Sequence, residues 1–420
     1  MYGEKMAIEI SGGSKVCGEL SIQGSKNAVL PIMAAALLGD GRTVIENCPD
    51  IRDVHVMAQI MRSIGAVVDY EDHVLTVEAS SVDQTFVSDS CAGDIRASVL
   101  FLGSLLSKYG AGGIRYPGGC SIGSRPIDFH LQAFQKMGIT VEEKEEEIFC
   151  GVEDCVRGAS ITLTFPSVGA TENILLAAVM ARGETIISGA AREPEIVHLC
   201  HFLNAMGAKI QGMGTDTILI EGVRELRGVT WQLCPDRIVF LTWALLTAGC
   251  GGEASLWMKD EIPVAEREVL TKLGCQIYEQ PGRYVLVQKG MQKPIRYLRT
   301  RPFPGYPTDG QSLLMPVLCK GMGISTIEEG IFENRFRMIR QLKKMGADIA
   351  YVSNRARITG VTRLHGASVT ADDLRSGAGL LIAASMAEGV SEIGSEIYIE
   401  RGYERVIEQM RALGIQARYS

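Results

Sequence analysis

The chain repeats one pattern six times, and this repetition limits the folds that it can adopt. A helix-like segment ends at a glycine six times, at spacings of 67–73 residues. The six glycines are Gly65, Gly138, Gly207, Gly274, Gly346 and Gly414. Six such units account for the 420 residues of the chain. Their period is longer than the roughly 20–50 residues of the common solenoid repeats, so a solenoid is disfavoured.

Each unit shows the same order of segments. It contains a nearly all-apolar stretch, such as residues 28–38, and this composition predicts a helix that is buried on all sides. A second, amphipathic helix follows. In the third unit its apolar face carries Ile196, Leu199, Leu203 and Met206, at the three- and four-residue spacing of a helix. Short strand-like segments flank both helices, so the unit is predicted to be β-α-β-α-β-β.

Six apolar helices require a core that encloses them. Closed assemblies of three units each would bury them, so the sequence predicts an α/β fold with two three-repeat domains. The buried helices begin at polar residues, and several show Asp shortly before or beside Arg, as at Asp236 and Arg237. Asp at such a position can simply cap the helix. Taken together, however, several helix N-termini and cations at one end of a domain predict an anionic ligand, such as a phosphate or carboxylate.

Charge, cysteine usage and missing motifs exclude several classes of protein. The net charge of −7 disfavours a general nucleic-acid surface. The 11 cysteines are odd in number and form no CxxC pair, which disfavours a disulfide framework or zinc ribbon and favours the reducing cytoplasm. We expect no signal peptide and no membrane span. Because no P-loop, GxGxxG or HExxH motif occurs, we expect no metal and no cofactor.

A glycine-rich stretch places a thiol near a guanidinium. The segment "YPGGCSIGSRP", residues 116–126, carries Cys120 between glycines, with Arg125 five residues later. Further glycines at 110, 112 and 113 precede it. This density predicts that residues 110–125 form a lid that closes over a ligand, although glycine equally suits a plain connector.

Repeats and motifs together resemble those of the enolpyruvyl transferases, in particular the branch that uses UDP-N-acetylglucosamine. The matching stretches are "GSKNAVLPIMAAALL", "DIRASVLFLG", "PGGCSIGSRPIDFH", "SVGATENILLAA", "AAREPEIVHL", "PDRI", "YPTDGQ", "IFENRF", "DLRSGAGL" and "IERGYER". The resemblance covers essentially the whole chain. It implies two inside-out α/β barrels of three repeats each, formed by residues 22–234, which carry the Cys120 loop, and by residues 1–21 with 235–420. The active site is then expected in the cleft between them.

The resemblance also implies a reaction. An enolpyruvyl group would pass from phosphoenolpyruvate to the 3′-hydroxyl of UDP-N-acetylglucosamine, with release of phosphate, as the first committed step of peptidoglycan synthesis. The vinyl carbon must gain a proton and the sugar hydroxyl must lose one, so the chemistry needs a general acid and a general base. The resemblance further implies inactivation by fosfomycin through alkylation of the thiol.

The catalytic roles follow from the matched motifs. Cys120 fits the acid, because a thiol with a pKa near ~8.5 is mostly protonated at neutral pH. Asp309 is our candidate base for the sugar hydroxyl, and it could also be a helix N-cap. Lys26 and Arg401 are expected to hold the anionic groups of phosphoenolpyruvate, and Arg125 its phosphate.

The remaining site residues have supporting roles. Asp373 and Arg375 are interpreted as helpers in proton and anion handling, or alternatively as a capping ion pair. Arg335 is either an active-site cation or a structural partner of Glu333. The other expected contacts to the substrates are Asn27, Arg96, Arg125, Pro126, Ile127, Asp128, Phe129, Ser167, Val168, Gly169 and Ile331.

One departure from the family pattern leaves alternatives open. Many members have a lysine, near the nucleotide phosphates, where this chain has Phe165. One nucleotide contact is therefore expected to be lost or replaced. The alternatives are the shikimate-pathway enolpyruvyl transferase, which lacks the cysteine loop, and a non-catalytic protein that binds UDP-sugars. The set Lys26, Cys120, Arg125, Asp309 and Arg401 favours the catalytic interpretation.

Overall fold

The computed structural model describes residues 7–87, 93, 95–118, 122–123 and 126–420. These residues form two compact units. The N-terminal unit contains the described part of 24–119 and 125–234, and the C-terminal unit contains that of 1–23, 120–124 and 235–420. Each unit has its own apolar core.

The six apolar stretches form helices, as predicted. In the N-terminal unit they are α1 (Lys26–Ala36), α3 (Leu100–Tyr109) and α5 (Val168–Ala178). In the C-terminal unit they are α7 (Arg237–Cys250), α9 (Thr308–Cys319) and α11 (Leu374–Met386). All 13 residues of α11 are buried. The three helices of each unit pack against one another, because a helix without a polar face has to be enclosed.

A second helix in each repeat ends at the predicted glycine. These helices are α2 (Arg52–Ser63), α4 (Asp128–Lys136), α6 (Pro194–Ala205), α8 (Val264–Leu273), α10 (Ile339–Lys344) and α13 (Val406–Ala412). The six glycines have φ between 79° and 112°, the left-handed conformation of a helix C-terminus. A 3-10 turn, η2 (Arg96–Val99), precedes α3, and a short helix, α12 (Ile397–Glu400), precedes α13.

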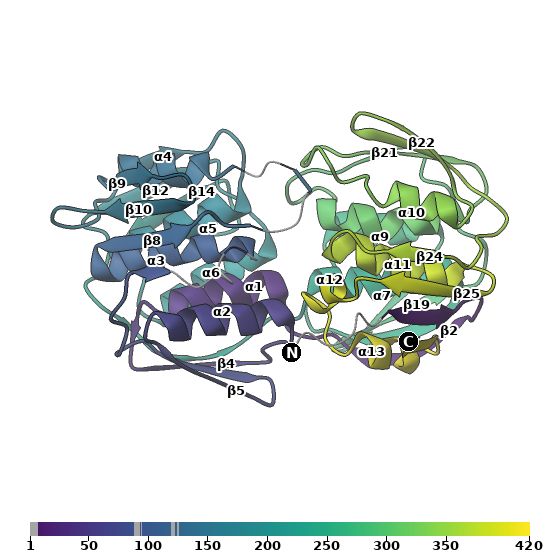
Figure 1. Ribbon diagram of the computed structural model, residues 1–420, viewed down its shortest axis with the longest axis horizontal. Coiled ribbons are helices and arrows are strands. Elements are labelled where there is room, and N and C mark those ends of the chain that lie inside the picture. Colours follow the sequence, from purple (N-terminus) through teal and green to yellow (C-terminus); the bar gives the residue numbers. More distant parts are fainter. Residues whose placement is uncertain (1–6, 88–92, 94, 119–121, 124–125) are drawn as a thin grey trace. The chain divides into compact units, whose positions relative to one another are not determined.

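The described residues of the N-terminal unit form three four-stranded sheets and one two-stranded sheet. Their strands are β3 (Gly39–Asp40), β4 (Arg42–Glu46), β5 (Val67–Glu71), β6 (Val74–Glu78), β7 (Phe86–Val87), β8 (Ala111–Arg115), β9 (Thr140–Glu143), β10 (Glu147–Gly151), β11 (Ser160–Thr162), β12 (Glu184–Ser188), β13 (Lys209–Gln211), β14 (Thr217–Glu221), β15 (Leu226–Arg227) and β16 (Thr230–Gln232). The orders are β16-β4-β6-β5, β7-β8-β10-β9, β11-β12-β14-β13 and β15-β3. Figure 1 shows α2 beside α1, with β4 and β5 on its other side.

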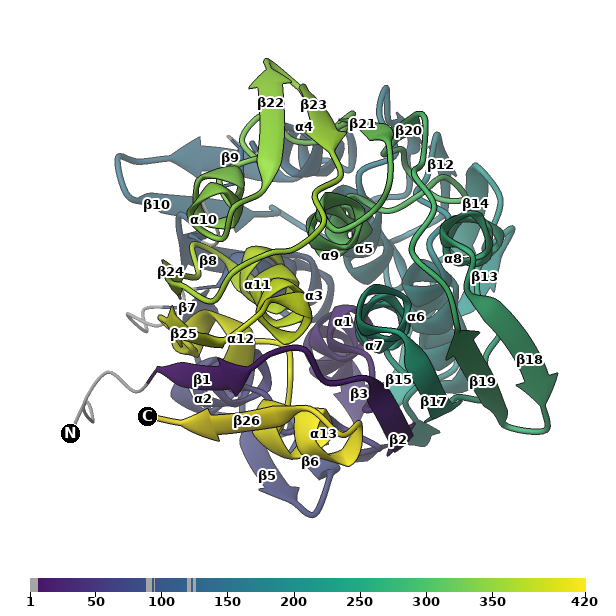
Figure 2. The same ribbon diagram turned by 90° about the vertical axis from the view of Figure 1, so that its right-hand side faces the viewer.

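In the part of the C-terminal unit that the structure describes, this design recurs as three four-stranded sheets. Their strands are β1 (Ile8–Ser11), β2 (Val16–Ser21), β17 (Gly252–Trp257), β18 (Gln276–Gln280), β19 (Arg283–Gln288), β20 (Leu298–Arg299), β21 (Ile324–Glu328), β22 (Asp348–Val352), β23 (Arg355–Thr359), β24 (Ser368–Thr370), β25 (Val390–Gly394) and β26 (Gln416–Tyr419). The orders are β18-β19-β17-β2, β20-β21-β23-β22 and β24-β25-β1-β26. In Figure 2, α7, α9 and α11 are seen nearly end-on, with these strands around them.

The start of the chain completes two sheets of the C-terminal unit. Strand β2 pairs in parallel with β17, in the position that β20 and β24 occupy in the other two sheets. Strand β1 lies between β25 and β26 and is antiparallel to both. It takes the position that β19 and β23 hold in the other two sheets of this unit.

The expectation of a lid over residues 110–125 is wrong for its first part. Residues 111–115 form β8, an inner strand that pairs with β7 and β10. Gly112 and Gly113 are buried there, and a Cβ on Gly113 would lie 2.6 Å from the Phe86 ring. These glycines therefore serve close packing, and not mobility.

Candidate active site

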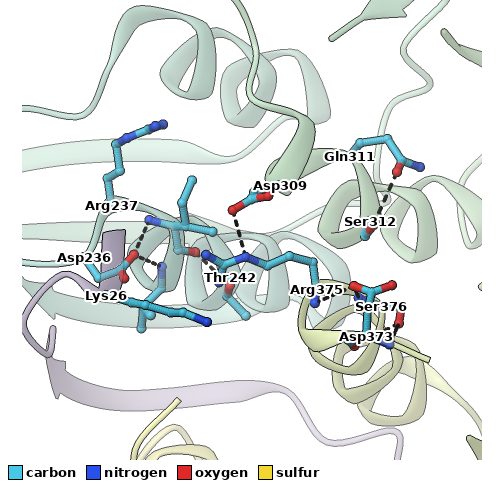
Figure 3. Close-up of polar contacts among 12 residues, drawn as sticks. Lys26, Asp236, Arg237, Thr242, Asp309, Gln311, Ser312, Asp373, Arg375 and Ser376 are labelled. Carbon is cyan, nitrogen blue, oxygen red and sulfur yellow. Dashed lines mark hydrogen bonds and ion pairs between the residues drawn. The ribbon is translucent and has the colours of Figure 1, made fainter. Parts of the chain in front are cut away.

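Asp309 is the centre of a cluster of charges in the C-terminal unit. Its carboxylate accepts a bond of 2.6 Å from Arg335 Nη2 and one of 2.9 Å from Arg375 Nε. Figure 3 shows Arg375 reaching from α11 to Asp309 at the start of α9. Both arginine side chains are nearly inaccessible to solvent, at 3% and 4%, whereas that of Asp309 is 26% exposed. The carboxylate is thus the part of the cluster that a ligand can reach.

The two arginines determine the ionisation of Asp309. Burial by itself would raise the pKa of this carboxyl, but the guanidiniums of Arg375 and Arg335 outweigh burial and hold the pKa well below its usual range. Asp309 is therefore anionic at every physiological pH. The N-cap of α9 is Pro307, so the alternative expectation that Asp309 caps this helix is wrong.

Asp373 does cap its helix. Its carboxylate accepts from the backbone N–H groups of Arg375 and Ser376, and the Ser376 hydroxyl accepts from the Asp373 N–H, which is a complete capping box. Arg375 points its guanidinium at Asp309 and donates from Nη1 to the Tyr403 hydroxyl at 3.4 Å. The capping half of the alternative interpretation is thus confirmed for Asp373, whereas the guanidinium of Arg375 pairs with Asp309.

Lys26 lies in the N-terminal unit as the first residue of α1. Its Nζ is 2.8 Å from Asp53 Oδ2, and both side chains are almost fully buried. A cation at a helix N-terminus is disfavoured by the macrodipole, so Asp53 offsets that repulsion and fixes the ammonium. Asn27, the next residue, is half-buried.

A second group of predicted residues meets around His130 in the N-terminal unit. Arg96 Nη2 donates to the Pro126 carbonyl at 3.1 Å. A Cβ on Gly169 would lie 3.4 Å from His130 Cε1, so the first turn of α5 lies directly against this ring. Ile127, Asp128 and Phe129 lie between Pro126 and His130, and Ser167 is the N-cap of α5, followed by Val168.

Asn173 fixes the protonation of His130. The Asn173 amide nitrogen donates to Val99 O at 2.9 Å and faces His130 Nδ1 at 3.0 Å, while its oxygen accepts from Gly103 N–H. His130 Nδ1 must therefore be an acceptor, which leaves the proton on Nε2. Burial and the Arg96 charge lower the pKa of His130 to about 3. The ring is consequently a neutral Nε2–H donor beside the first turn of α5.

A second histidine, His198, is half-buried, and its pKa determines how it contributes to the pH dependence of stability. His198 Nε2 accepts from Trp231 Nε1–H at 2.9 Å and from Cys234 N–H at 3.3 Å. Burial and His201 lower the pKa of His198 to about 4 from an ordinary 6.5. The unfolded chain thus binds more protons between those values, and the His198 contribution is present above pH 6.5 and is lost as pH falls toward 4.

We expect the unfolding midpoint to fall on acidification from about pH 7 to about pH 5, with His198 contributing on the order of 1–2 kcal/mol. In His198→Gln the amide oxygen replaces Nε2 as the hydrogen-bond acceptor and does not titrate. The loss of stability on acidification is therefore expected to be smaller in this variant. The exposed His55, changed to Gln, is the control. The unfolding midpoint is measured by thermal denaturation. If it falls equally on acidification in wild type and in His198→Gln, this assignment is refuted.

The structure places some, but not all, of the remaining predicted residues. Cys120 and Arg125 lie outside the described residues. Arg401 is half-buried at the C-terminal end of α12. The backbone N–H of Ile331 donates to Glu329 Oε1 at 2.9 Å. Phe165 is 38% exposed just before α5, and its carbonyl accepts from Ser167 N–H.

Three polar residues of these clusters were missed by the sequence reasoning. Asp53 pairs with Lys26, His130 lies against Gly169, and Tyr403 contacts Arg375. His130 and Tyr403 stand within the quoted motifs "PGGCSIGSRPIDFH" and "IERGYER", which offered a signal for them. Asp53 stands in no quoted motif, and its partner is known only from the folded chain.

Neither a metal cluster nor a membrane helix is present in the described part of the chain. Within residues 7–87, 93, 95–118, 122–123 and 126–420, no three His, Cys, Asp or Glu side chains are grouped so that they could hold a metal ion. Over the same residues, no helix is both long enough and apolar enough to cross a bilayer.

Comparison with known proteins identifies the family. The family model described as EPSP synthase (3-phosphoshikimate 1-carboxyvinyltransferase) matches residues 10–410. Among solved structures, the enolpyruvyl transferase NikO from Streptomyces tendae superposes with a TM-score of 0.88 at 24% identity, covering 100% of this chain and 99% of that one. EPSP synthase from Acinetobacter baumannii gives 0.76 at 17% identity, covering 99% and 100%. These two likenesses establish the fold, a mixed α/β enolpyruvyl transferase fold.

Curated relatives are more similar in sequence. UDP-N-acetylglucosamine 1-carboxyvinyltransferase 1 of Carboxydothermus hydrogenoformans is 42% identical over 416 residues, 98% of this chain and 97% of that protein. UDP-N-acetylglucosamine 1-carboxyvinyltransferase of Finegoldia magna is 39% identical over 413 residues, 97% of each. The chain therefore belongs to the UDP-N-acetylglucosamine 1-carboxyvinyltransferase branch of the EPSP synthase family.

Proposed function

We propose that this protein is a UDP-N-acetylglucosamine 1-carboxyvinyltransferase. It transfers the enolpyruvyl group of phosphoenolpyruvate to the 3′-hydroxyl of UDP-N-acetylglucosamine and releases phosphate, which commits the sugar nucleotide to peptidoglycan synthesis. The observation that carries the proposal is the match at about 40% identity, over nearly the full length of both chains, to relatives of that name. The reaction needs no metal and no cofactor from the protein.

The chemistry proceeds by addition and elimination. A proton is added to C3 of phosphoenolpyruvate, the 3′-oxygen bonds to C2, and the hydroxyl proton leaves, which gives a tetrahedral phospho-adduct. Loss of a proton from C3 and of phosphate from C2 then restores the double bond as an enol ether. The same C3 gains and loses one proton, so the net products are the enolpyruvyl ether and phosphate.

We assign the proton transfers to Cys120 and Asp309. The thiol of Cys120 donates to C3, and Asp309 accepts from the sugar hydroxyl. An aspartate between two guanidiniums is a weak base, but the hydroxyl becomes strongly acidic as its oxygen bonds to C2. Proton transfer to Asp309 therefore accompanies C–O bond formation. Arg335 and Arg375 keep the carboxylate ionised and oriented until that moment.

Cationic side chains bind the anionic groups of phosphoenolpyruvate in this proposal. Lys26 and Arg401 hold the carboxylate and phosphate of phosphoenolpyruvate, and Arg125 also binds the phosphate. Asp373, through its cap, sets the start of α11 and thus Arg375. The sugar nucleotide contacts the remaining residues of the proposed site, which are Asn27, Arg96, Pro126, Ile127, Asp128, Phe129, Ser167, Val168, Gly169 and Ile331.

The proposal includes the architecture that the reaction requires. Each unit is an inside-out α/β barrel of three repeats, with boundaries near residues 22 and 234, and the two substrates bind in the cleft between the barrels. The segment that carries Cys120 closes over them and excludes water. The nine cysteines in the described residues are free thiols, which supports a reducing, cytoplasmic location.

A phosphate-release assay tests this function. Phosphoenolpyruvate is supplied with UDP-N-acetylglucosamine or with shikimate 3-phosphate as acceptor. We expect phosphate release with the sugar nucleotide alone. Release with shikimate 3-phosphate would identify the rival transferase, and no release with either acceptor would favour a binding protein and contradict the proposal.

Phe165 gives a separate prediction about nucleotide affinity. Its side chain is 38% exposed beside the N-cap of α5, where a lysine would meet the nucleotide phosphates. An exposed ion pair contributes about 0.2–1 kcal/mol, so Phe165→Lys is expected to lower KM for UDP-N-acetylglucosamine by up to about fivefold. Phe165→Gln controls for loss of the ring. An unchanged KM in steady-state kinetics would remove this residue from the phosphate site.

A further inference from the structure

Gln23 is a buried glutamine at the end of the N-terminal segment of the C-terminal unit, three residues before Lys26. Its side chain bonds mainly to one turn, and its Oε1 also accepts a longer bond of 3.4 Å from Gln409 Nε2. Nε2 donates to the Gly402 carbonyl at 3.1 Å, and Oε1 accepts from the Glu404 N–H at 3.1 Å. The two contacts fix the orientation of the amide, because a flipped amide would face donor with donor and acceptor with acceptor.

The turn that Gln23 holds is the one that carries Arg401. Residues 401–404 connect α12 to α13, and Arg405, which follows, has a φ of 41° in the left-handed region. A non-glycine residue keeps such a conformation when its surroundings fix it. Gln409 assists, since its Nε2 donates to Glu404 O at 2.8 Å and its Oε1 accepts from Trp243 Nε1–H at 3.0 Å.

A hydroxyl anchors the same turn to the Asp309 cluster. Thr242 donates its proton to Ile238 O at 2.8 Å, so it must accept from Tyr403 at 2.7 Å. The Tyr403 oxygen is then the acceptor for Arg375 Nη1. Gln23 also contacts the start of α7. Its backbone carbonyl accepts a hydrogen bond from the Asp236 N–H at 2.8 Å, and Asp236 caps α7.

From these contacts we infer that Gln23 is a positioning residue for Arg401, and through it for the phosphoenolpyruvate anion. The inference rests on the proposed function. Its physical basis is that one rigid amide joins the segment leading to Lys26 to the turn bearing Arg401, the two cations assigned to the same small ligand. Loosening the turn disperses Arg401 over several positions and weakens donor binding before it affects the acceptor.

The test is steady-state kinetics of Gln23→Ala with each substrate varied. We expect KM for phosphoenolpyruvate to rise about tenfold, with KM for UDP-N-acetylglucosamine within about twofold of wild type. Gln292→Ala is the matched control. Gln292 is equally buried, and its Nε2 donates to Ala248 O and Gly249 O at the opposite end of α7. It should lose similar stability and keep the wild-type KM for both substrates.

Gln23→Glu adds a readout that a general loss of stability would not produce. Its carboxylate still accepts from Glu404 N–H, but it donates to Gly402 O only when protonated. The KM for phosphoenolpyruvate relative to wild type should therefore improve as pH falls from about 8 to about 6. The inference alone would be overturned if Gln23→Ala turned over with an unchanged KM for phosphoenolpyruvate. It would also be overturned if Gln23→Ala and Gln292→Ala raised that KM equally. No turnover by wild type would overturn the proposed function and the inference with it.

Discussion

Replacing Cys120 with alanine is expected to lower kcat by about 10²–10⁴-fold, the usual contribution of a general acid. Alanine removes the thiol proton and little else, so the fold should be unchanged by circular dichroism and thermal denaturation. Cys155→Ala is the control, because this half-buried thiol contacts Asp154 and has no assigned role. The measurement is phosphate release under saturating substrates.

The same variant tests which thiol is reactive. Fosfomycin should add its mass to the peptide that contains Cys120 in the wild type, and to none in Cys120→Ala. Near-normal turnover by Cys120→Ala would refute its role as the acid. A mass shift on any other cysteine-containing peptide would contradict the assignment of the reactive thiol.

Asp309→Asn is expected to have the second-largest effect, on both activity and stability. The amide cannot take a proton, so turnover should fall by about 10²–10⁴-fold. It also removes the carboxylate charge that pairs with both Arg335 and Arg375, whose side chains are nearly inaccessible to solvent. Breaking a buried ion pair in this way should lower the free energy of unfolding by about 3 kcal/mol. Kinetics and urea denaturation measure the two effects separately.

Glu328→Gln is a matched control for Asp309→Asn. Glu328 also lies between two arginines, with Arg355 Nε at 2.5 Å and Arg299 Nε at 3.4 Å, but these guanidiniums are solvated, at 65% and 46% exposed. Glu328→Gln should therefore lower the free energy of unfolding by less than Asp309→Asn does, and it should leave turnover unchanged. If Asp309→Asn kept at least a tenth of wild-type turnover, Asp309 would not be the acceptor of the hydroxyl proton.

Local physical chemistry made much of the fold predictable. The six glycine-terminated helices followed from periodicity and from the left-handed cap, and all six glycines adopt it. The apolar helices were recognisable because a segment such as α11 has no polar face for solvent. The prediction failed at residues 111–115, because glycine content does not distinguish a mobile loop from a strand packed against Phe86.

The candidate site was predictable only in part. Motif resemblance named Asp309, Arg335 and Arg375, and the structure brings these three together. Their pairing could not be derived from the sequence, because Arg375 is 66 residues from Asp309 and the contact depends on how α9 and α11 pack. For the same reason neither the Asp53 partner of Lys26 nor the bonds of Gln23 to the 402–404 turn could be foreseen.

Product analysis tests the central claim most directly. The purified protein is incubated with phosphoenolpyruvate and UDP-N-acetylglucosamine, and the products are identified by mass spectrometry and nuclear magnetic resonance. We predict UDP-N-acetylglucosamine bearing one enolpyruvyl ether on its 3′-oxygen, formed in equal amount with phosphate. Phosphate without this ether, or an unchanged sugar nucleotide after prolonged incubation, would contradict the account.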